Sequence, residues 1–343
     1  MKLLTLSDLT SGPGAALLES TLSMGFSEPV ARRGLQAELD AWLAPGALDR
    51  VREELDGIDA SRFPREVLIV GAATLPVSTM RACLMARLLG ARVLLKPASG
   101  REDLAAAIAR ADDAIEPRCF ASSDHEAFAR AVASVDTVVA LGSDESLTQI
   151  ASRLLPEQTF VGYGHRVSAV HLHNPGLDEL SALASDLLAW DGHGCMSPQV
   201  IWTPEEPAVA ARAIAEAVRE VETELPFAPS AEMSHHHYVT EALGAMEGTV
   251  LKTEASLLIA QDDPTFVESP GGRLVRVLPD RGAPWEALGE RLSALGCSRN
   301  STAQPLSPST RRCPLGEMQR PPVDWPHDGA PNLLPMLRGA VRP

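Results

Sequence analysis

The sequence predicts an α/β protein built on a doubly wound, mostly parallel sheet. Residues 65–76 read as a buried strand followed by a small-residue loop, and residues 91–99 read as a second strand. Between them, residues 77–90 have a helical period that stops at Gly90, a glycine typical of helix ends. Strand, helix and strand in about 30 residues form a βαβ unit, which implies parallel strands and a right-handed crossover.

The alternation of strand and helix patterns continues along the chain. Helical patterns cover residues 101–115, 144–155, 176–190, 207–225 and 238–247, and strand patterns cover residues 135–143, 166–173, 199–203 and short pieces between 250 and 279. Residues 1–62 read as helical, whereas residues 297–326, rich in Ser, Pro and Arg, read as a loop. The alternation favours a doubly wound sheet that binds ligands outside the carboxyl ends of its strands.

Composition and charge limit the classes of function. The 343 residues suffice for one large domain or two linked ones, and a net charge of -15 disfavours broad binding to nucleic acid. The most apolar stretch, residues 67–95, is interrupted by Pro76 and two arginines, which predicts no membrane span. Asp8 comes too early for a secretory signal. Five cysteines without metal-type spacing indicate free thiols in a cytoplasmic protein.

Lys96 stands out because the chain has only three lysines, the others being Lys2 and Lys252, beside 27 arginines. An ammonium at the carboxyl end of a parallel strand is placed to meet a ribose or a phosphate. The alternative is a strand-end lysine whose ammonium extends into solvent.

Residues 141–146, Leu-Gly-Ser-Asp-Glu-Ser, place Gly142 and Ser143 between a strand and a helix. Backbone N–H groups at such a turn can bind a pyrophosphate, although Asp144 and Glu145 would oppose an anion. The alternative is that Ser143 or Asp144 caps the helix.

Residues 191–200, Asp-Gly-His-Gly-Cys-Met-Ser-Pro-Gln-Val, place Cys195 between a helix and a strand. Gly192 and Gly194 permit unusual backbone angles, and His193 lies two positions before the thiol. A thiol becomes a useful nucleophile when an imidazolium or backbone donors lower its pKa. The alternative is a buried cysteine in a tight turn.

The other histidines favour simpler interpretations. Residues 234–238, Ser-His-His-His-Tyr, read as a polar helix start rather than a metal site. His171 and His173 share a face of one strand, with no carboxylate or cysteine companion evident nearby in the sequence. We therefore predict no metal site.

Together these stretches resemble the LuxC-type acyl-CoA reductase family of the aldehyde dehydrogenase superfamily. The resemblance rests on residues 67–99 with Lys-Pro-Ala-Ser, residues 138–150, residues 183–202 with Cys-Met-Ser-Pro-Gln, and residues 312–329 with Trp-Pro-His-Asp-Gly. It extends in order over roughly residues 64–338.

The resemblance implies a chemistry for these residues. Cys195 would take the acyl group from acyl-CoA as a thioester, and hydride from NADPH would then release an aldehyde. Lys96 would contact the adenosine ribose or its 2′-phosphate, and Gly142 with Ser143 would line the path of the cofactor.

Three departures from the superfamily pattern matter. Residues 162–166, Gly-Tyr-Gly-His-Arg, replace a segment that usually carries a glutamate base, which favours reduction over aldehyde oxidation. Thr74 stands where an oxyanion-binding asparagine is usual, and loss of a good donor there costs ~10²–10³ in rate. Ser99, near Lys96 and Arg101, stands where NAD-using relatives often carry a carboxylate, which favours NADPH.

The implied architecture is aldehyde-dehydrogenase-like, a doubly wound cofactor domain plus an α/β catalytic domain. We expect the cofactor domain to cover residues 1–175, with residues 311–343 returning to it, and the catalytic domain to cover residues 176–310. The predicted function is NADPH-dependent reduction of a fatty acyl-CoA to an aldehyde. The alternatives are a cofactor-independent acyltransferase or thioesterase using the same cysteine, and a non-catalytic scaffold subunit. Acyl-CoA is the expected partner, with a homo-oligomer or an acyl-donor protein as further partners.

Overall fold

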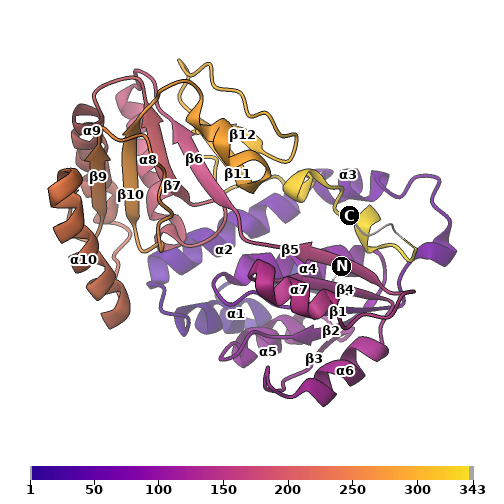
Figure 1. Ribbon diagram of the computed structural model, residues 1–343. Helices are drawn as coiled ribbons and strands as arrows, with labels where there is room; N and C mark the ends of the chain where they lie inside the picture. Colours follow the sequence, from indigo (N-terminus) through magenta and orange to yellow (C-terminus); the bar gives the residue numbers. More distant parts are fainter. Residues whose placement is uncertain (1, 340–343) are drawn as a thin grey trace. The chain divides into compact units, whose positions relative to one another are not determined.

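The computed structural model describes residues 2–339, which form two compact units (Figure 1). Unit 1 comprises the described residues of 1–24, 35–165 and 322–343, and unit 2 comprises residues 25–34 and 166–321. The chain therefore leaves unit 1 for residues 25–34, returns, and enters unit 2 again at Arg166. These bounds differ from the expected 175/176 and 310/311 divisions of the sequence.

Unit 1 is built on a parallel five-stranded sheet with the order β3-β2-β1-β4-β5. Its strands are β1 (Glu66–Val70), β2 (Arg92–Lys96), β3 (Ile115–Pro117), β4 (Thr137–Leu141) and β5 (Thr159–Tyr163). In the register of β1 and β2, Val70 lies opposite Lys96, so the lysine ends its strand beside the loop that follows β1. A parallel sheet is buried on both faces, which explains the continuous apolar runs of β1 and β2.

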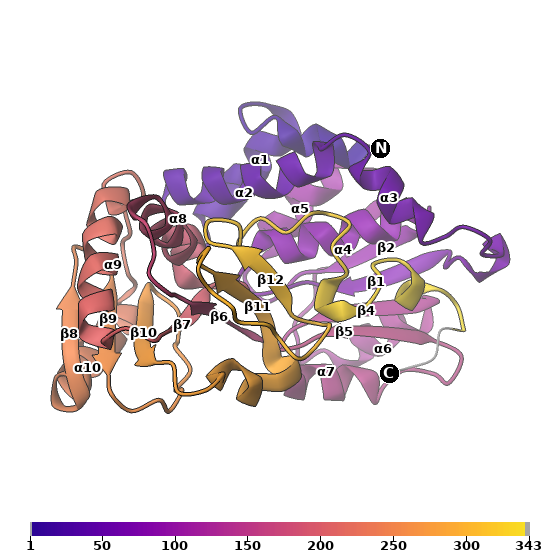
Figure 2. The ribbon, with the colours of Figure 1, turned by 90° about the horizontal axis from the view of Figure 1, so that it is seen from above.

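Helices cover both faces of this sheet, as a doubly wound fold requires. They are α1 (Gly12–Leu22), α3 (Ala47–Glu53), α4 (Pro76–Leu88), α5 (Glu102–Ala111), α6 (His125–Ala133) and α7 (Asp144–Ala151), with 3-10 turns η1 (Lys2–Ser7), η2 (Ala60–Arg62), η5 (His327–Gly329) and η6 (Leu334–Met336). The apolar face of α6 packs Phe128 and Val132 against Leu68 of the sheet. Figure 2 shows η6 beside β4 and β5, where the Thr137 hydroxyl donates to the Met336 carbonyl at 2.9 Å.

Unit 2 is built on a seven-stranded sheet with the order β12-β11-β6-β7-β10-β9-β8. Its strands are β6 (Val167–His171), β7 (Pro198–Thr203), β8 (Gly248–Lys252), β9 (Leu257–Gln261), β10 (Leu274–Pro279), β11 (Leu292–Cys297) and β12 (Arg311–Pro314). Every neighbouring pair is parallel except β8 with β9, which is antiparallel. The carboxyl ends of β6, β7, β10 and β11 therefore lie at one edge of the sheet, and their amino ends lie at the other.

The helices of unit 2 are α8 (Leu177–Leu188), α9 (Pro207–Glu222) and α10 (Ala231–Glu247), with 3-10 segments η3 (Ala189–Gly192) and η4 (Pro284–Arg291). The helix α2 (Glu28–Leu43) begins in this unit and ends in unit 1. On β9, Leu258 shares a small cavity with Val218 of α9, whereas Ile259 lies where a side chain at Gly244 of α10 would be. Because adjacent strand residues face opposite ways, α9 and α10 cover opposite faces of the sheet.

The structure corrects several sequence-based expectations. The strand expected at residues 166–173 is β6, and it joins the sheet of unit 2 rather than the doubly wound sheet. The short strands β3 and β5 were not anticipated, and β12 lies inside the segment expected to be a loop. The helix expected from residue 238 begins at Ala231, so residues 234–238 lie within its first turns rather than starting it. Among the described residues, we find no helix with the length and apolarity needed to cross a bilayer.

Candidate active site

The bend that carries Cys195 joins α8 to β7 in unit 2. Its residues Trp190, Asp191, Gly192 and Gly194 have φ of 52°, 53°, 73° and 106°, all in the left-handed region. Two of these residues carry side chains, for which that region costs roughly 1–2 kcal/mol per residue. The backbone therefore follows a path that the surrounding structure has to impose.

Cys195 itself is partly exposed at the amino end of β7. Its carbonyl accepts a 2.6 Å hydrogen bond from the hydroxyl of Ser168 on β6, which anchors the segment to the sheet. The hydroxyl of Ser197 donates to the His193 carbonyl at 2.7 Å and closes the turn around the cysteine. The alternative of a buried cysteine is therefore wrong for the described structure.

His193 lies on the same bend, and its ring is largely enclosed. It faces the ring of Phe26 edge-on at 6.4 Å between centroids, and a Cβ at Gly271 would come within 2.6 Å of its Nδ1. Burial lowers the pKa of His193 from its ordinary value of 6.5. The imidazole is therefore neutral at neutral pH, and the idea of an imidazolium that lowers the pKa of the thiol is not supported.

Asp191 forms an ion pair with Arg273, which precedes β10. The Nε and Nη2 groups of Arg273 both donate to Oδ1 of Asp191, at 2.9 and 2.6 Å, and both side chains are almost fully buried. Burial raises the pKa of the Asp191 carboxyl, and the Arg273 guanidinium opposes this effect. Sequence reasoning missed both residues, since they are far apart in the chain.

Unit 1 holds the residues expected to contact a cofactor. Lys96 is only 6% exposed, so the alternative of an ammonium extending into solvent is wrong. Its Nζ donates to the carbonyl of Pro97 at 3.1 Å and lies 5.5 Å from the centroid of the Phe120 ring. Burial lowers the pKa of Lys96, and the nearby carboxylate of Glu102 partly opposes this.

Ser99 and Ser122 link the loops that follow β2 and β3. Their hydroxyl oxygens lie 3.3 Å apart, and Ser99 is exposed. Arg101 donates from Nε to the carbonyl of Ala73 at 2.9 Å, so it connects this region to the loop after β1. Thr74 lies exposed in that same loop, two residues before α4 begins at Pro76.

Gly142 and Ser143 follow β4 as expected. Ser143 is the N-cap of α7, and its hydroxyl oxygen accepts from the Ser146 amide at 3.3 Å, which confirms the capping interpretation. Asp144 accepts from the His165 amide at 3.1 Å and so closes the turn after β5. A Cβ at Gly142 would meet only Ser146, at 3.7 Å, so a side chain there would project into open space beside the turn.

The residues of unit 1 fit a nicotinamide dinucleotide. Lys96 ends β2, Ser99 follows it and Gly142 follows β4, so all three lie at the carboxyl ends of the two strands that flank β1. Doubly wound sheets bind nucleotides at this position. A cation and a hydroxyl suit a ribose phosphate, and the open side of Gly142 permits close approach of a ligand to the backbone. The structure thus groups the expected site residues by unit: Thr74, Lys96, Ser99, Gly142 and Ser143 lie in unit 1, and His193 and Cys195 lie in unit 2.

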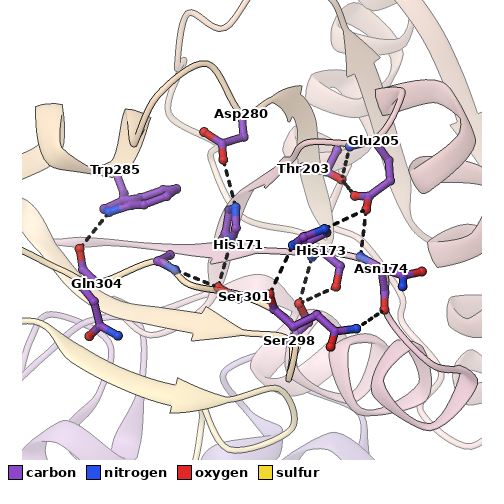
Figure 3. Close-up of polar contacts among 12 residues, drawn as sticks. His171, His173, Asn174, Thr203, Glu205, Asp280, Trp285, Ser298, Ser301 and Gln304 are labelled. Carbon is purple, nitrogen blue, oxygen red and sulfur yellow. Dashed lines mark hydrogen bonds and ion pairs between the residues drawn. The ribbon is translucent and has the colours of Figure 1, made fainter.

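A second polar cluster occupies the carboxyl edge of the sheet in unit 2 (Figure 3). The ring of His171 lies between the hydroxyl of Ser301, 2.6 Å from Nδ1, and the carboxylate of Asp280, 3.0 Å from Nε2. His173 lies 4.0 Å from Glu205. The expectation that these histidines lack carboxylate companions is therefore wrong, because the companions come from distant parts of the chain.

No metal centre is indicated. Within residues 2–339, no group of three or more His, Cys, Asp or Glu side chains is arranged to hold a metal ion. The absence of a metal from the reaction stays a prediction.

A cavity beside Gly192 and Arg273 has room for about one water molecule, so it is no preformed tunnel for an acyl chain.

Fold and site together define an α/β protein of two units with an aldehyde-dehydrogenase-like fold and a cysteine just before a central strand. Among solved structures, an NAD-dependent aldehyde dehydrogenase from Sinorhizobium meliloti is 16% identical with a TM-score of 0.62, covering 88% of this chain and 70% of that chain. An NADP-dependent glyceraldehyde-3-phosphate dehydrogenase from Bacillus halodurans C-125, complexed with NADP, is 15% identical with a TM-score of 0.69, covering 98% and 84%. The protein GapN from Methanocaldococcus jannaschii, also complexed with NADP, is 13% identical with a TM-score of 0.65, covering 88% and 75%.

The family assignment is more specific. Residues 8–277 match the family described as acyl-CoA reductase (LuxC), whereas no curated protein matched the chain. The chain belongs to the LuxC acyl-CoA reductase family and is an oxidoreductase, as the resemblance implied. Membership of a reductase family supports the predicted use of a reduced cofactor, NADPH.

Proposed function

We propose that this protein reduces fatty acyl-CoA to the aldehyde with NADPH, through an acyl thioester on Cys195. One observation carries the proposal: in a member of the acyl-CoA reductase family, a partly exposed thiol lies on a bend with four left-handed residues. Strain of this kind is concentrated at functional sites in proteins. A reductase that works through a thioester needs its sulfur held and accessible in this way.

The first half of the reaction takes place at unit 2. The Cys195 sulfur attacks the thioester carbonyl, the bond to the CoA sulfur breaks, and CoA leaves as its thiol. His193, whose burial lowers its pKa and favours the neutral imidazole, is assigned the role of accepting the proton from the Cys195 thiol and donating it to the departing CoA sulfur. This division replaces one difficult reduction by two easier steps.

In the second half, NADPH, when bound, would supply the hydride that reduces the acyl thioester to the aldehyde. We assign the Thr74 hydroxyl to donate a hydrogen bond to the oxyanion, which then collapses to release aldehyde and the Cys195 thiolate. The turn at residues 162–166 lacks the glutamate that would activate water in an aldehyde-oxidising dehydrogenase of this superfamily. Release by hydride is therefore favoured over release by water.

Binding of NADPH is assigned to unit 1. Lys96 and Ser99 would contact the ribose and its 2′-phosphate, and Gly142 with Ser143 would line the path of the cofactor. We expect Lys96→Met to raise KM for NADPH about tenfold and KM for NADH less, because the lost cation faces a phosphate. Lys252→Met, which removes an exposed lysine, is the matched control and leaves both KM values unchanged. Equal effects on both cofactors would refute contact with the 2′-phosphate.

The deciding experiment is intact-protein mass spectrometry with fatty acyl-CoA in the absence and presence of NADPH. Without NADPH, the protein gains the mass of one acyl group and Cys195→Ser does not hold it as a thioester. With NADPH, the adduct disappears and absorbance of the reduced nicotinamide falls as aldehyde forms. Release of CoA with no consumption of NADPH would instead identify a transferase or thioesterase, and no adduct at all would favour a scaffold subunit.

Location and partners complete the proposal. We place the enzyme in the cytoplasm, because the described cysteines are all free thiols. An acyl-donor protein or a second copy of the chain is proposed as a partner in the cell. Analytical ultracentrifugation of the purified protein, with and without acyl-CoA, tests the second of these.

A further inference from the structure

The bend before Cys195 is held by a matching bend in a distant part of the chain. Gly271, Gly272 and Arg273 have φ of 84°, 66° and 60°, so three consecutive residues also lie in the left-handed region. The backbone N–H of Arg273 donates to the Asp191 carbonyl at 3.0 Å, while its guanidinium binds the Asp191 carboxylate. One residue therefore holds both the backbone and the side chain of Asp191.

The two bends approach each other so closely that glycines are required. A Cβ at Gly192 would lie 3.0 Å from the Arg273 nitrogen, and a Cβ at Gly271 would lie 2.6 Å from the His193 ring. Both are distances that real Cβ contacts rarely or never show. The segment 271–273 thus packs directly against the three residues that precede Gly194 and the thiol.

Arg273 is fixed in turn by its own neighbours. Its guanidinium carbon lies 4.9 Å from the centroid of the Phe227 ring, a cation–π contact. The carbonyl of Gly272 lies 2.6 Å from Nε2 of His237 on α10. The loop that holds the cysteine bend is therefore itself anchored to a helix and an aromatic ring.

A third contact holds the start of the bend. Trp190 packs edge-on against Phe26 at 5.2 Å between ring centroids, and a Cβ at Gly34 would lie 2.3 Å from the indole. The positive φ of Trp190 and Asp191 is thus supported on one side by the indole and on the other by the ion pair with Arg273.

From this geometry we propose that the Asp191–Arg273 pair is a positioning device that sets the orientation of the Cys195 thiol for attack on the acyl-CoA carbonyl. A buried ion pair contributes little to stability compared with apolar residues of the same volume, so stability alone does not account for it. A misplacement of about 1 Å at a reacting group costs ~10²-fold in rate, so holding the bend has a direct chemical consequence. The proposal rests on the proposed function, in which Cys195 is the nucleophile.

The test removes the pair without leaving a buried charge. The double variant Asp191→Asn with Arg273→Met is made in a Cys119→Ser background, because Cys119 is exposed while Cys83, Cys297 and Cys313 are buried. The single variant Arg273→Lys keeps the charge but loses the forked contact. The matched control is Glu38→Gln with Arg81→Met, a second buried pair at 2.8 Å in unit 1.

Three readouts separate positioning from general stability. The first is the rate of Cys195 alkylation by iodoacetamide across pH 6 to 9, the second is acyl-enzyme formation from acyl-CoA without NADPH, and the third is the midpoint of denaturant unfolding. We expect the double variant to alkylate about tenfold more slowly with a shifted pH profile, and to form acyl-enzyme ~10²-fold more slowly. Its unfolding midpoint falls no more than that of the control, whose alkylation rate stays within twofold of the parent.

The outcomes that overturn the proposal are distinct from failure of the proposed function. Alkylation and acylation rates within twofold of the parent in the double variant would show that the pair is structural only. If the double variant does not fold, the same comparison is made with Arg273→Lys against the parent. A parent protein that accepts no acyl group would refute the proposed function, yet the alkylation assay would still decide whether Arg273 sets the reactivity of the thiol.

Discussion

The two ends of the sheet in unit 2 each carry a histidine near a hydroxyl or a thiol, but they differ in burial and in backbone conformation. At the carboxyl end, Ser301, His171 and Asp280 form a continuous line of hydrogen bonds that, by its contacts alone, resembles a hydrolase relay. Ser301 is only 7% exposed, and none of the three residues has a positive φ. At the amino end, Cys195 is partly exposed on a bend that the surrounding structure must hold.

This difference shows how to separate a structural network from a reactive site. Hydrogen-bonded partners and full burial stabilise a polar group inside the protein, and they also block a substrate. Residues with strained backbone conformations lower the stability of a folded protein, and they are concentrated at functional sites, where the strained conformation serves the reaction. We therefore interpret the carboxyl end as structural and the amino end as catalytic.

The largest expected effect comes from removing the thiol. Cys195→Ala should lower aldehyde formation by at least about 10³-fold, because the acyl group then has no nucleophile to bind. The free energy of unfolding should change by less than about 1 kcal/mol, because the side chain is partly exposed and small. Turnover assays with acyl-CoA and NADPH, together with urea unfolding, measure both. If this variant still formed aldehyde at the parent rate, Cys195 would not be the nucleophile and the amino end of the sheet could not be interpreted as catalytic.

The carboxyl end should show the reverse behaviour. His171→Leu leaves the Asp280 carboxylate and the Ser301 hydroxyl without their shared partner, and it should lower the free energy of unfolding by about 2–4 kcal/mol. The rate of acyl-enzyme formation per folded molecule should stay within twofold of the parent. Denaturant unfolding and mass spectrometry provide these two values.

A matched control exists on the same strand end. The side chain of His173 is 45% exposed, and its ring lies 3.2 Å from the Asn300 carbonyl and 4.0 Å from the Glu205 carboxylate. Because contacts this exposed contribute little, His173→Ala should change the free energy of unfolding by less than about 1 kcal/mol. If His171→Leu abolished acyl transfer while the protein stayed folded, the carboxyl end would have to be reassigned as part of the reaction.

The smallest effect concerns the charge of His193. Its folded pKa lies below the unfolded value of 6.5, so the unfolded chain binds a proton that the folded protein resists. The parent should therefore lose stability relative to His193→Gln as pH falls below 6.5, and the difference should be constant above that value. Urea unfolding of both proteins from pH 8 to pH 5 measures it. A parent that instead gains stability on acidification would indicate an imidazolium beside the thiol.

The sequence predicted those features that depend on neighbours along the chain. The first βαβ unit, the position of Lys96 at the end of a strand and the glycine-rich bend follow from short patterns: an apolar run, a helical period and glycines on either side of a cysteine. The burial of Lys96 was not predicted from these patterns. The family resemblance added the roles proposed for Cys195 and Lys96. The Ser143 cap was likewise readable from one turn of sequence.

Features that depend on distant pairing were not predictable in this way. The strand β6 reads like the strands of unit 1, and only its pairing with β7 and β11 places it in the other sheet. Likewise, nothing local to Asp191 indicates Arg273, and nothing local to His171 indicates Asp280. A single sequence contains the residues of such pairs but gives no sign of which positions meet.

The contact of Trp190 with Gly34 has a practical consequence for protein engineering. Residues 25–34 belong to unit 2 and supply the surface against which the indole rests. Replacing this segment with that of a relative would change the side chains that support the bend before Cys195 without altering any residue of the bend itself. Chimeras of this enzyme should therefore keep Phe26 and Gly34 together with the cysteine segment.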